Sequence, residues 1–201
     1  IANCRIENDP SVSNDRPMIA ILSNVNGITI KDNEFNGRRI QYNDGIKVLR
    51  ASDEALDKSS FGIKGDVTIT GNTFSNYQQY TIWLREYGAG NYVIENNVFN
   101  NIGVTDGSHA AVNFITSHVG TGELNISVKY NVINGGLMLL RVDGAVSNGS
   151  IEANYNVLQG TNPETTPTKY VKDLSGLTSQ LKITWYARSR TSSGSNEWAV
   201  I

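Results

Sequence analysis

The chain has 201 residues, a formal net charge of −2 and a single cysteine, Cys4. This length fits one domain of ordinary size with room for a small appendage. The charge lacks the basic excess of a nucleic-acid binder, no apolar run reaches the roughly 18–20 residues of a membrane span, and one cysteine excludes a disulfide scaffold.

Asparagine is unusually frequent, with 24 residues beside 19 glycines. Asparagine and glycine favour tight corners, whereas the valine, isoleucine and threonine between them favour strands. The composition therefore predicts a β-rich chain with many turns.

A five-residue word recurs along the chain. It reads Asn-x-Phe, Ile or Leu followed by two mostly polar residues, and cysteine replaces the asparagine in the first copy. The copies begin at Cys4, Asn33, Asn72, Asn97, Asn131 and Asn156. Each later copy follows a strand-like segment, at residues 27–30, 66–69, 91–94, 125–128 and 149–151. The intervals of 29, 39, 25, 34 and 25 residues predict a minimal coil of 25 residues enlarged by loop insertions.

A second strand-like segment lies between consecutive words. We align residues 21–23, 48–50, 83–85, 114–116 and 139–141, and the central residues Leu22, Leu49, Leu84, Ile115 and Leu140 are predicted to point inward. A coil of this length buries little by itself and must stack on its neighbours, so the repeat predicts a solenoid.

The repeated Val-x-Ile-x-x-Asn-x-Phe pattern resembles that of right-handed parallel β-helices of the pectate-lyase-like superfamily. The resemblance covers about residues 1–160, and Asn33, Asn72, Asn97, Asn131 and Asn156 resemble the asparagine ladder at one corner of such coils. It implies an all-β fold, a right-handed parallel β-helix of about five coils. Residues 161–201 are interpreted as a linker and a C-terminal cap or appendage. Because the chain begins inside a repeat, we expect a missing N-terminal segment or another subunit, as in a homotrimer, to cover that end.

The residues that flank the inward column are predicted to form an outer wall. One flank is Ser23, Arg50, Arg85, Thr116 and Arg141, and the other is Ile21, Val48, Trp83, Phe114 and Leu139. Guanidinium groups bind carboxylates in a bidentate manner, and aromatic faces stack on sugar rings. We therefore expect an acidic polysaccharide to bind Arg50, Trp83, Arg85, Phe114 and Lys47. Two alternatives stay open: the arginines are solvated and paired with local acids, or the inward and outward faces are reversed.

Catalytic candidates are Glu86, Asp143 and Arg141. Glycoside hydrolysis needs two carboxylates roughly 5–9.5 Å apart, which Glu86 and Asp143 would supply. A lyase instead needs a base beside a neutralised carboxylate, for which Lys47 and Tyr87 are available. His109 and His118 are further acid or base candidates, and each is also compatible with an ordinary loop position.

The resemblance implies carbohydrate binding within an extracellular, cell-surface or virion protein that degrades polysaccharides, such as a tailspike depolymerase or a lyase. The scaffold specifies function poorly, so a non-enzymatic adhesion or spacer module is the alternative. We expect no cofactor, with calcium on scattered aspartates left open, and no nucleic-acid partner.

Overall fold

The structure is a computed structural model of the 201-residue chain. It describes residues 1–9, 11, 18–21, 25–38, 45–48, 63–77, 81–84, 90–102, 111–115, 124–134, 140–143, 149–159, 171–172, 181–190 and 196–200. Within these ranges the chain forms strands, turns and bends and no helix, so the predicted all-β class is confirmed.

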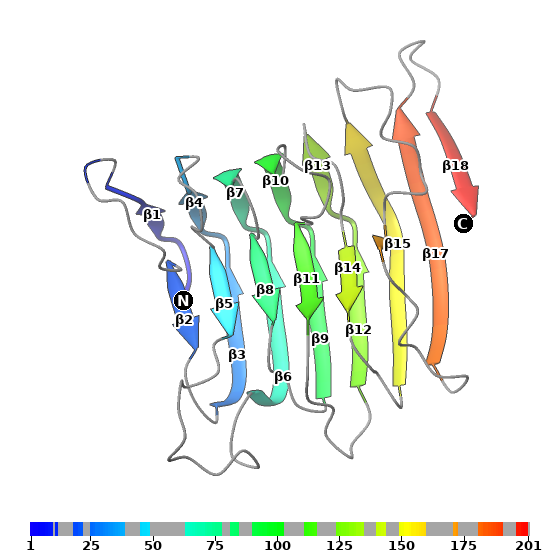
Figure 1. The fold of residues 1–201 in the computed structure, drawn as a ribbon, viewed down its shortest axis with the longest axis horizontal. Coiled ribbons are helices and arrows are strands. Elements are labelled where there is room, and N and C mark those ends of the chain that lie inside the picture. The colour runs from blue at the N-terminus through cyan, green and yellow to red at the C-terminus, as the bar shows by residue number, and fades with distance from the viewer. Residues whose placement is uncertain are drawn as a thin grey trace.

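The strands are arranged in three rows (Figure 1), and up to residue 143 neighbours within a row lie three strands apart in the chain. The first row contains β3 (Val25–Lys31), β6 (Ile63–Thr70), β9 (Gly90–Glu95), β12 (Leu124–Lys129) and the start of β15 (Gly149–Gln159). The second row contains β1 (Arg5–Glu7), β4 (Glu34–Asn36), β7 (Thr73–Tyr77), β10 (Val98–Ile102), β13 (Val132–Asn134) and the end of β15. These two rows belong to one sheet.

The third row is a separate sheet of six parallel strands. It contains β2 (Ile19–Ile21), β5 (Ile46–Val48), β8 (Ile82–Leu84), β11 (Val112–Ile115), β14 (Leu140–Asp143) and β16 (Val171–Lys172). Parallel neighbours require a crossover of a dozen or more residues, and here each crossover runs through the other two rows. The chain therefore passes through all three rows before it returns to pair with itself.

The recurring word sets the register of the second row, as predicted. Its large apolar residues are Cα partners from strand to strand: Ile6, Phe35, Phe74, Phe99, Ile133 and Leu158. The rings of Phe35, Phe74 and Phe99 are stacked, with centroids 4.7 and 5.2 Å apart. Residues 25 to 39 positions apart in the chain thus lie directly beside one another.

One apolar core lies between the rows. Its buried members come from the first row, such as Ile69 and Ile94, from the second, such as Phe74, and from the third, such as Ile82 and Leu84. The side chains of the first row alternate between buried and partly exposed, as the period of two predicted. All three rows therefore contribute one face to a common interior.

Parallel pairing continues beyond residue 160. The pair Leu140–Val171 joins β14 to β16, and β17 (Leu181–Arg190) pairs in parallel with β15. β18 (Asn196–Val200) then pairs antiparallel with β17 and lies at the end of the sheet (Figure 1). The repeat therefore extends into the segment interpreted as a linker and cap, and only β18 departs from the parallel pattern among the strands that the structure describes.

The alignment predicted for the third row is confirmed between Ile21 and Val48, and it is wrong by one to three residues at each later step. Leu84 pairs with Val48 and Phe114, whereas Leu140 pairs with Val112. Leu84 and Leu140 are both buried as predicted, but they occupy different columns. The number of residues between the word and the third-row strand varies, for example from Phe74 to Ile82 and from Phe99 to Val112, so aligning the nearest aliphatic residues misplaced the register.

Candidate functional site

The asparagine ladder fixes the corner between the first and second rows. Asn33, Asn72, Asn97, Asn131 and Asn156 are all buried. The side-chain amide of each asparagine donates to Oδ1 of the next at 2.9–3.1 Å, and so does its backbone N–H at 2.9–3.0 Å. The backbone N–H of Cys4 donates in the same way to Asn33 Oδ1 at 3.0 Å. The predicted ladder is confirmed, and it explains why an asparagine begins five of the six words.

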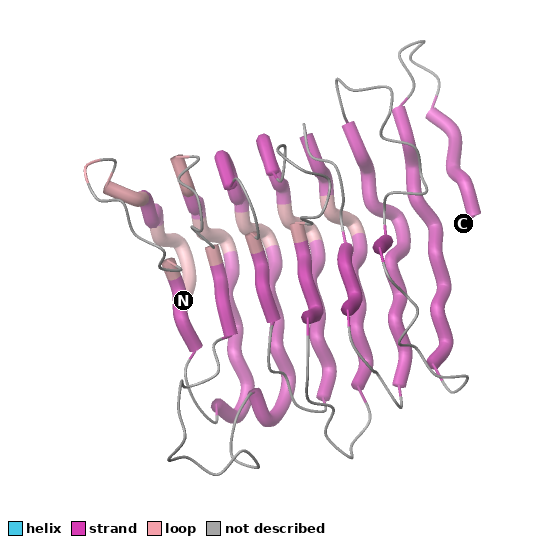
Figure 2. Tube along the Cα trace, in the orientation of Figure 1, coloured by secondary structure: helices cyan, strands magenta, loops and turns pink. Residues whose placement is uncertain are grey.

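The residue just before each ladder position turns the corner. It has positive φ in all six copies: Asn3, Asp32, Gly71, Asn96, Tyr130 and Tyr155. Asparagine, aspartate and glycine enter this left-handed region most readily, whereas a bulky residue does so at a cost in strain. Figure 2 shows the corners up to Tyr130 as short loops that join the first and second rows, whereas Tyr155 lies within the continuous strand β15.

The corrected register brings Lys47, Trp83 and Arg141 into one column of the third row. Lys47 is the Cα partner of Trp83, Trp83 of Asn113, and Asn113 of Arg141, which is followed by Lys172. Ile82 and Leu84, on either side of Trp83, are fully buried, and Trp83 is partly exposed. Because side chains alternate along a strand, the Trp83 side chain lies on the face of the sheet opposite to Ile82 and Leu84.

Lys172 and Asn113 were missed because their place depends on a register that the sequence alone did not fix. We name the five positions Lys47, Trp83, Asn113, Arg141 and Lys172 the third-row column. At about 4.8 Å per strand the column spans about 19 Å. It contains two lysines, one arginine, one asparagine and one tryptophan at successive positions of one register.

The other predicted site residues are placed differently. Phe114 occupies the column of Leu84 instead of the column of Trp83, and Asp143 is the Cα partner of Ile115. Arg50, Arg85 and Glu86 lie outside the described residues, as do Tyr87, His109 and His118. The predicted pairing of Glu86 with Asp143 therefore stays a prediction.

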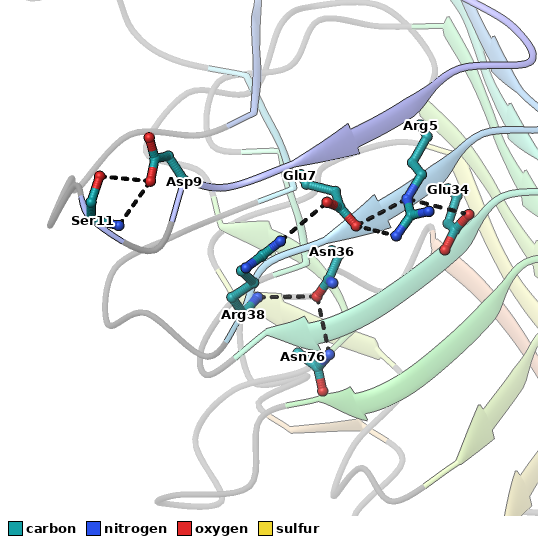
Figure 3. Close-up of polar contacts among 8 residues, drawn as sticks. All are labelled: Arg5, Glu7, Asp9, Ser11, Glu34, Asn36, Arg38 and Asn76. Atoms are coloured by element: carbon teal, nitrogen blue, oxygen red, sulfur yellow. Dashed lines mark hydrogen bonds and ion pairs between the residues drawn. The ribbon is translucent and has the colours of Figure 1, made fainter.

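A charged cluster lies on the outer surface of the first strands of the second row (Figure 3). Arg5 donates to Glu7 Oε1 at 2.9 Å through Nε, and Arg38 donates to Glu7 Oε2 at 3.2 Å. Glu34 lies 3.9 Å from Arg5 Nε. These hydrogen bonds, first that from Arg5 and then that from Arg38, lower the pKa of Glu7. All of these charges are engaged with one another at the surface.

A hollow of about 480 Å³ lies beside this cluster. It is lined by Asn3, Cys4, Arg5, Asp32, Asn33, Glu34, Gly71 and Thr73. The absence of a side chain at Gly71 contributes to it, because a Cβ there would lie 2.3 Å from Asp32 Oδ1. Among the described residues no three histidine, cysteine, aspartate or glutamate side chains are placed to hold a metal ion.

No family model matches the chain, and comparisons with curated proteins and with solved structures likewise give no match. Within the described part of the chain, no helix is long and apolar enough to cross a bilayer. What the fold and the site define is therefore an all-β protein of parallel strands in which Lys47, Trp83, Arg141 and Lys172 share one register column.

Proposed function

We propose that the chain is a right-handed parallel β-helix that binds an acidic polysaccharide along its third row. The fold proposal is supported by the spacing of three strands within each row, the common core and the asparagine ladder. Crossovers between parallel strands of one sheet are right-handed in almost all proteins, which supports the proposed hand.

The third-row column is the observation that carries the binding proposal. A linear polyanion is bound by cationic groups along one line, and Lys47, Arg141 and Lys172 share one register column, with Arg141 three strands from Lys47 and one strand from Lys172. Arginine binds a carboxylate with two hydrogen bonds, and the partly exposed Trp83 offers an aromatic surface to a sugar ring. The length of about 19 Å suits several sugar units of an extended chain.

The binding test is affinity electrophoresis in gels that contain polygalacturonate or alginate. We expect both polyanions to retard the wild-type chain and Arg141→Ala to lose about tenfold in affinity, which corresponds to one strong charged contact. Arg5→Ala is the matched control, because Arg5 lies in the second row and pairs with Glu7. Equal losses for the two variants, or no retardation of the wild type, would contradict the proposal and favour the spacer alternative.

Within this proposal the chain belongs to an extracellular, cell-surface or virion protein that degrades polysaccharides, and it uses no cofactor. Mass spectrometry of a glycan incubated with the chain separates the reactions. A lyase leaves an unsaturated product that absorbs in the ultraviolet, whereas a hydrolase adds one water for each bond cleaved. An unchanged glycan that is nevertheless bound would assign the chain a binding role alone.

A further inference from the structure

Two tyrosines occupy a backbone position that disfavours them. Tyr130 and Tyr155 are the corner residues of their coils, with φ of 55° and 58°. The four preceding corners hold asparagine, aspartate or glycine, which adopt this conformation at lower cost. A bulky residue with positive φ is uncommon, and such strain persists where the surrounding structure or a function maintains it.

The same two tyrosines are also among the most exposed large hydrophobic residues that the structure describes. Their exposed fractions are 50% for Tyr130 and 46% for Tyr155. The rings are stacked, with centroids 5.2 Å apart and planes inclined by 6°. The backbone strain and the exposed aromatic surface therefore coincide at two successive coils, and burial of the rings does not account for either.

One face of the Tyr130 ring is turned toward the preceding coil because of the direction in which the two rings are stacked. The centroid separation is close to the strand spacing of about 4.8 Å, so the rings lie one over the other along the direction in which the coils are stacked. One face of Tyr130 is turned toward Tyr155. The opposite face is turned toward the preceding coil, whose corner residue is the exposed and shorter Asn96.

Polar side chains lie on the strands that lead into these corners, where Lys129 is the Cα partner of Glu95. Glu95 precedes Asn96 in the chain and accepts a hydrogen bond of 2.6 Å from Ser127 Oγ. Lys129 precedes Tyr130 and forms an ion pair with Glu152 on β15. The hydrogen bond to Glu152 raises the pKa of Lys129 against the opposing effect of burial, with smaller raising contributions from the charge of Glu152 and from nearby Glu95 and Tyr130. The two glutamates and the lysine sum to one negative charge.

We propose that the Tyr130 face and the adjoining Glu95, Asn96 and Ser127 form a binding site for an uncharged polysaccharide. The apolar side of a sugar ring packs on an exposed aromatic face, and its hydroxyls bond to carboxylate and amide groups beside that face. The local negative charge disfavours a polyanion such as a uronate chain or a nucleic acid. This site lies on the sheet that contains β9, β12 and β15, so it is distinct from the third-row column and does not depend on the proposed function.

The chain itself suggests the best variant. Tyr130→Asn introduces at this corner the residue that Asn96 already supplies one coil earlier, so it removes the ring and relieves the strained backbone. A purely structural tyrosine stack predicts a lower melting temperature for this variant. A binding site predicts an unchanged or higher melting temperature together with weaker binding.

The test is affinity electrophoresis in separate gels that contain hydroxyethylcellulose, soluble starch or laminarin. We expect at least one of these neutral polysaccharides to retard the wild-type chain. Tyr130→Asn should bind that polysaccharide about tenfold more weakly, and Tyr130→Phe, which keeps the ring, should stay within about twofold. Glu95→Gln should weaken binding less than Tyr130→Asn, because it retains an oxygen acceptor.

Controls separate this site from the third row. Arg141→Ala should leave retardation by the neutral polysaccharide unchanged, and Tyr130→Asn should leave retardation by polygalacturonate unchanged. The proposal is overturned if none of the three neutral polysaccharides retards the wild type, if Tyr130→Asn binds as tightly as the wild type, or if this variant loses melting temperature and affinity together.

Discussion

Two adjacent positions at each corner follow opposite rules. At the inner position every described coil from Asn33 to Asn156 has a buried asparagine that bonds to its neighbours. One residue earlier, at the outer position, the coils share only a positive φ, and their side chains range from glycine to tyrosine. The inner residue is constrained because buried polar groups must be satisfied, whereas the outer residue faces solvent and is free to vary. The inner position therefore specifies the fold, and the outer position determines the chemistry of the surface.

The largest loss of stability is expected when one ring is removed from the buried phenylalanine stack of the second row. Phe74→Ala removes a fully buried ring that stacks on both Phe35 and Phe99. We expect the free energy of unfolding to fall by about 3–5 kcal/mol, because a large cavity forms and two ring contacts are lost. Phe74→Leu should cost clearly less. Urea denaturation followed by circular dichroism measures both, and equal small losses would contradict close packing of the stack.

Breaking the ladder itself should have the next largest effect. Asn97→Ala removes the acceptor of the Asn72 backbone N–H and one of the three acceptors of the Asn72 side-chain amide, and it removes the amide that donates to the carbonyls of Ile69 and Glu95. Because stranded buried groups cost about 1–3 kcal/mol, we expect the free energy of unfolding to fall by about 2–4 kcal/mol. Asn91→Ala is the matched control on the same coil, since Asn91 is exposed, and its effect should stay within about 0.5 kcal/mol. Urea denaturation of both variants makes the comparison, and equal losses would remove the distinction between buried and exposed asparagines.

At the outer corner position, the free energy of unfolding should depend on how well the residue tolerates a positive φ. Gly71 has φ of 68°, and a Cβ there would approach Asp32 Oδ1. We expect Gly71→Ala to lower the free energy of unfolding by about 1–2 kcal/mol. Gly71→Asn should cost less, because asparagine tolerates this region better than alanine. Thermal denaturation distinguishes them, and a more stable alanine variant would contradict the positive φ.

The smallest effect is expected at the exposed charges of the outer surface. The pKa of Glu7 is lowered from its ordinary value of 4.5, first by the hydrogen bond from Arg5 and then by that from Arg38. The stabilisation is therefore fully present above this ordinary value and is lost as the pH falls through the lower pKa of the folded state. Glu7→Gln should show a shallower loss of melting temperature on acidification, and added salt should reduce the difference. Identical profiles for the variant and the wild type would contradict this role.

The same contrast explains which features could be predicted from the sequence. The word beginning at Asn72 or Asn97 has a polar residue that must be satisfied and a large apolar residue two positions later, so both ladder and register could be predicted. The third row has no such polar marker, and the insertions before Ile46 and Val112 differ in length. Trp83 was therefore aligned with Phe114, although its partner in the structure is Asn113.

The candidate site could be predicted only in part for the same reason. Lys47, Trp83 and Arg141 were chosen for their chemistry, but a shift of one residue in register moves a side chain to the other face of a sheet. Tyr130 and Tyr155 were not singled out, because nothing in a tyrosine indicates a left-handed backbone. Their significance follows only from the φ angles of the corner they share with Asn96.

The central claim is that successive coils lie over one another in register, and disulfide crosslinking tests it most directly. In a Cys4→Ser background, cysteines at the partner positions Thr73 and Val98 stand about 4.8 Å apart, within the range that a disulfide spans. Cysteines at Thr73 and Asn100, two residues out of register, stand about 8 Å apart, beyond that range. We expect the first pair of cysteines to oxidise rapidly to a disulfide and the second pair to form little disulfide. Preferential crosslinking of the second pair, or of neither, would contradict the stacked arrangement.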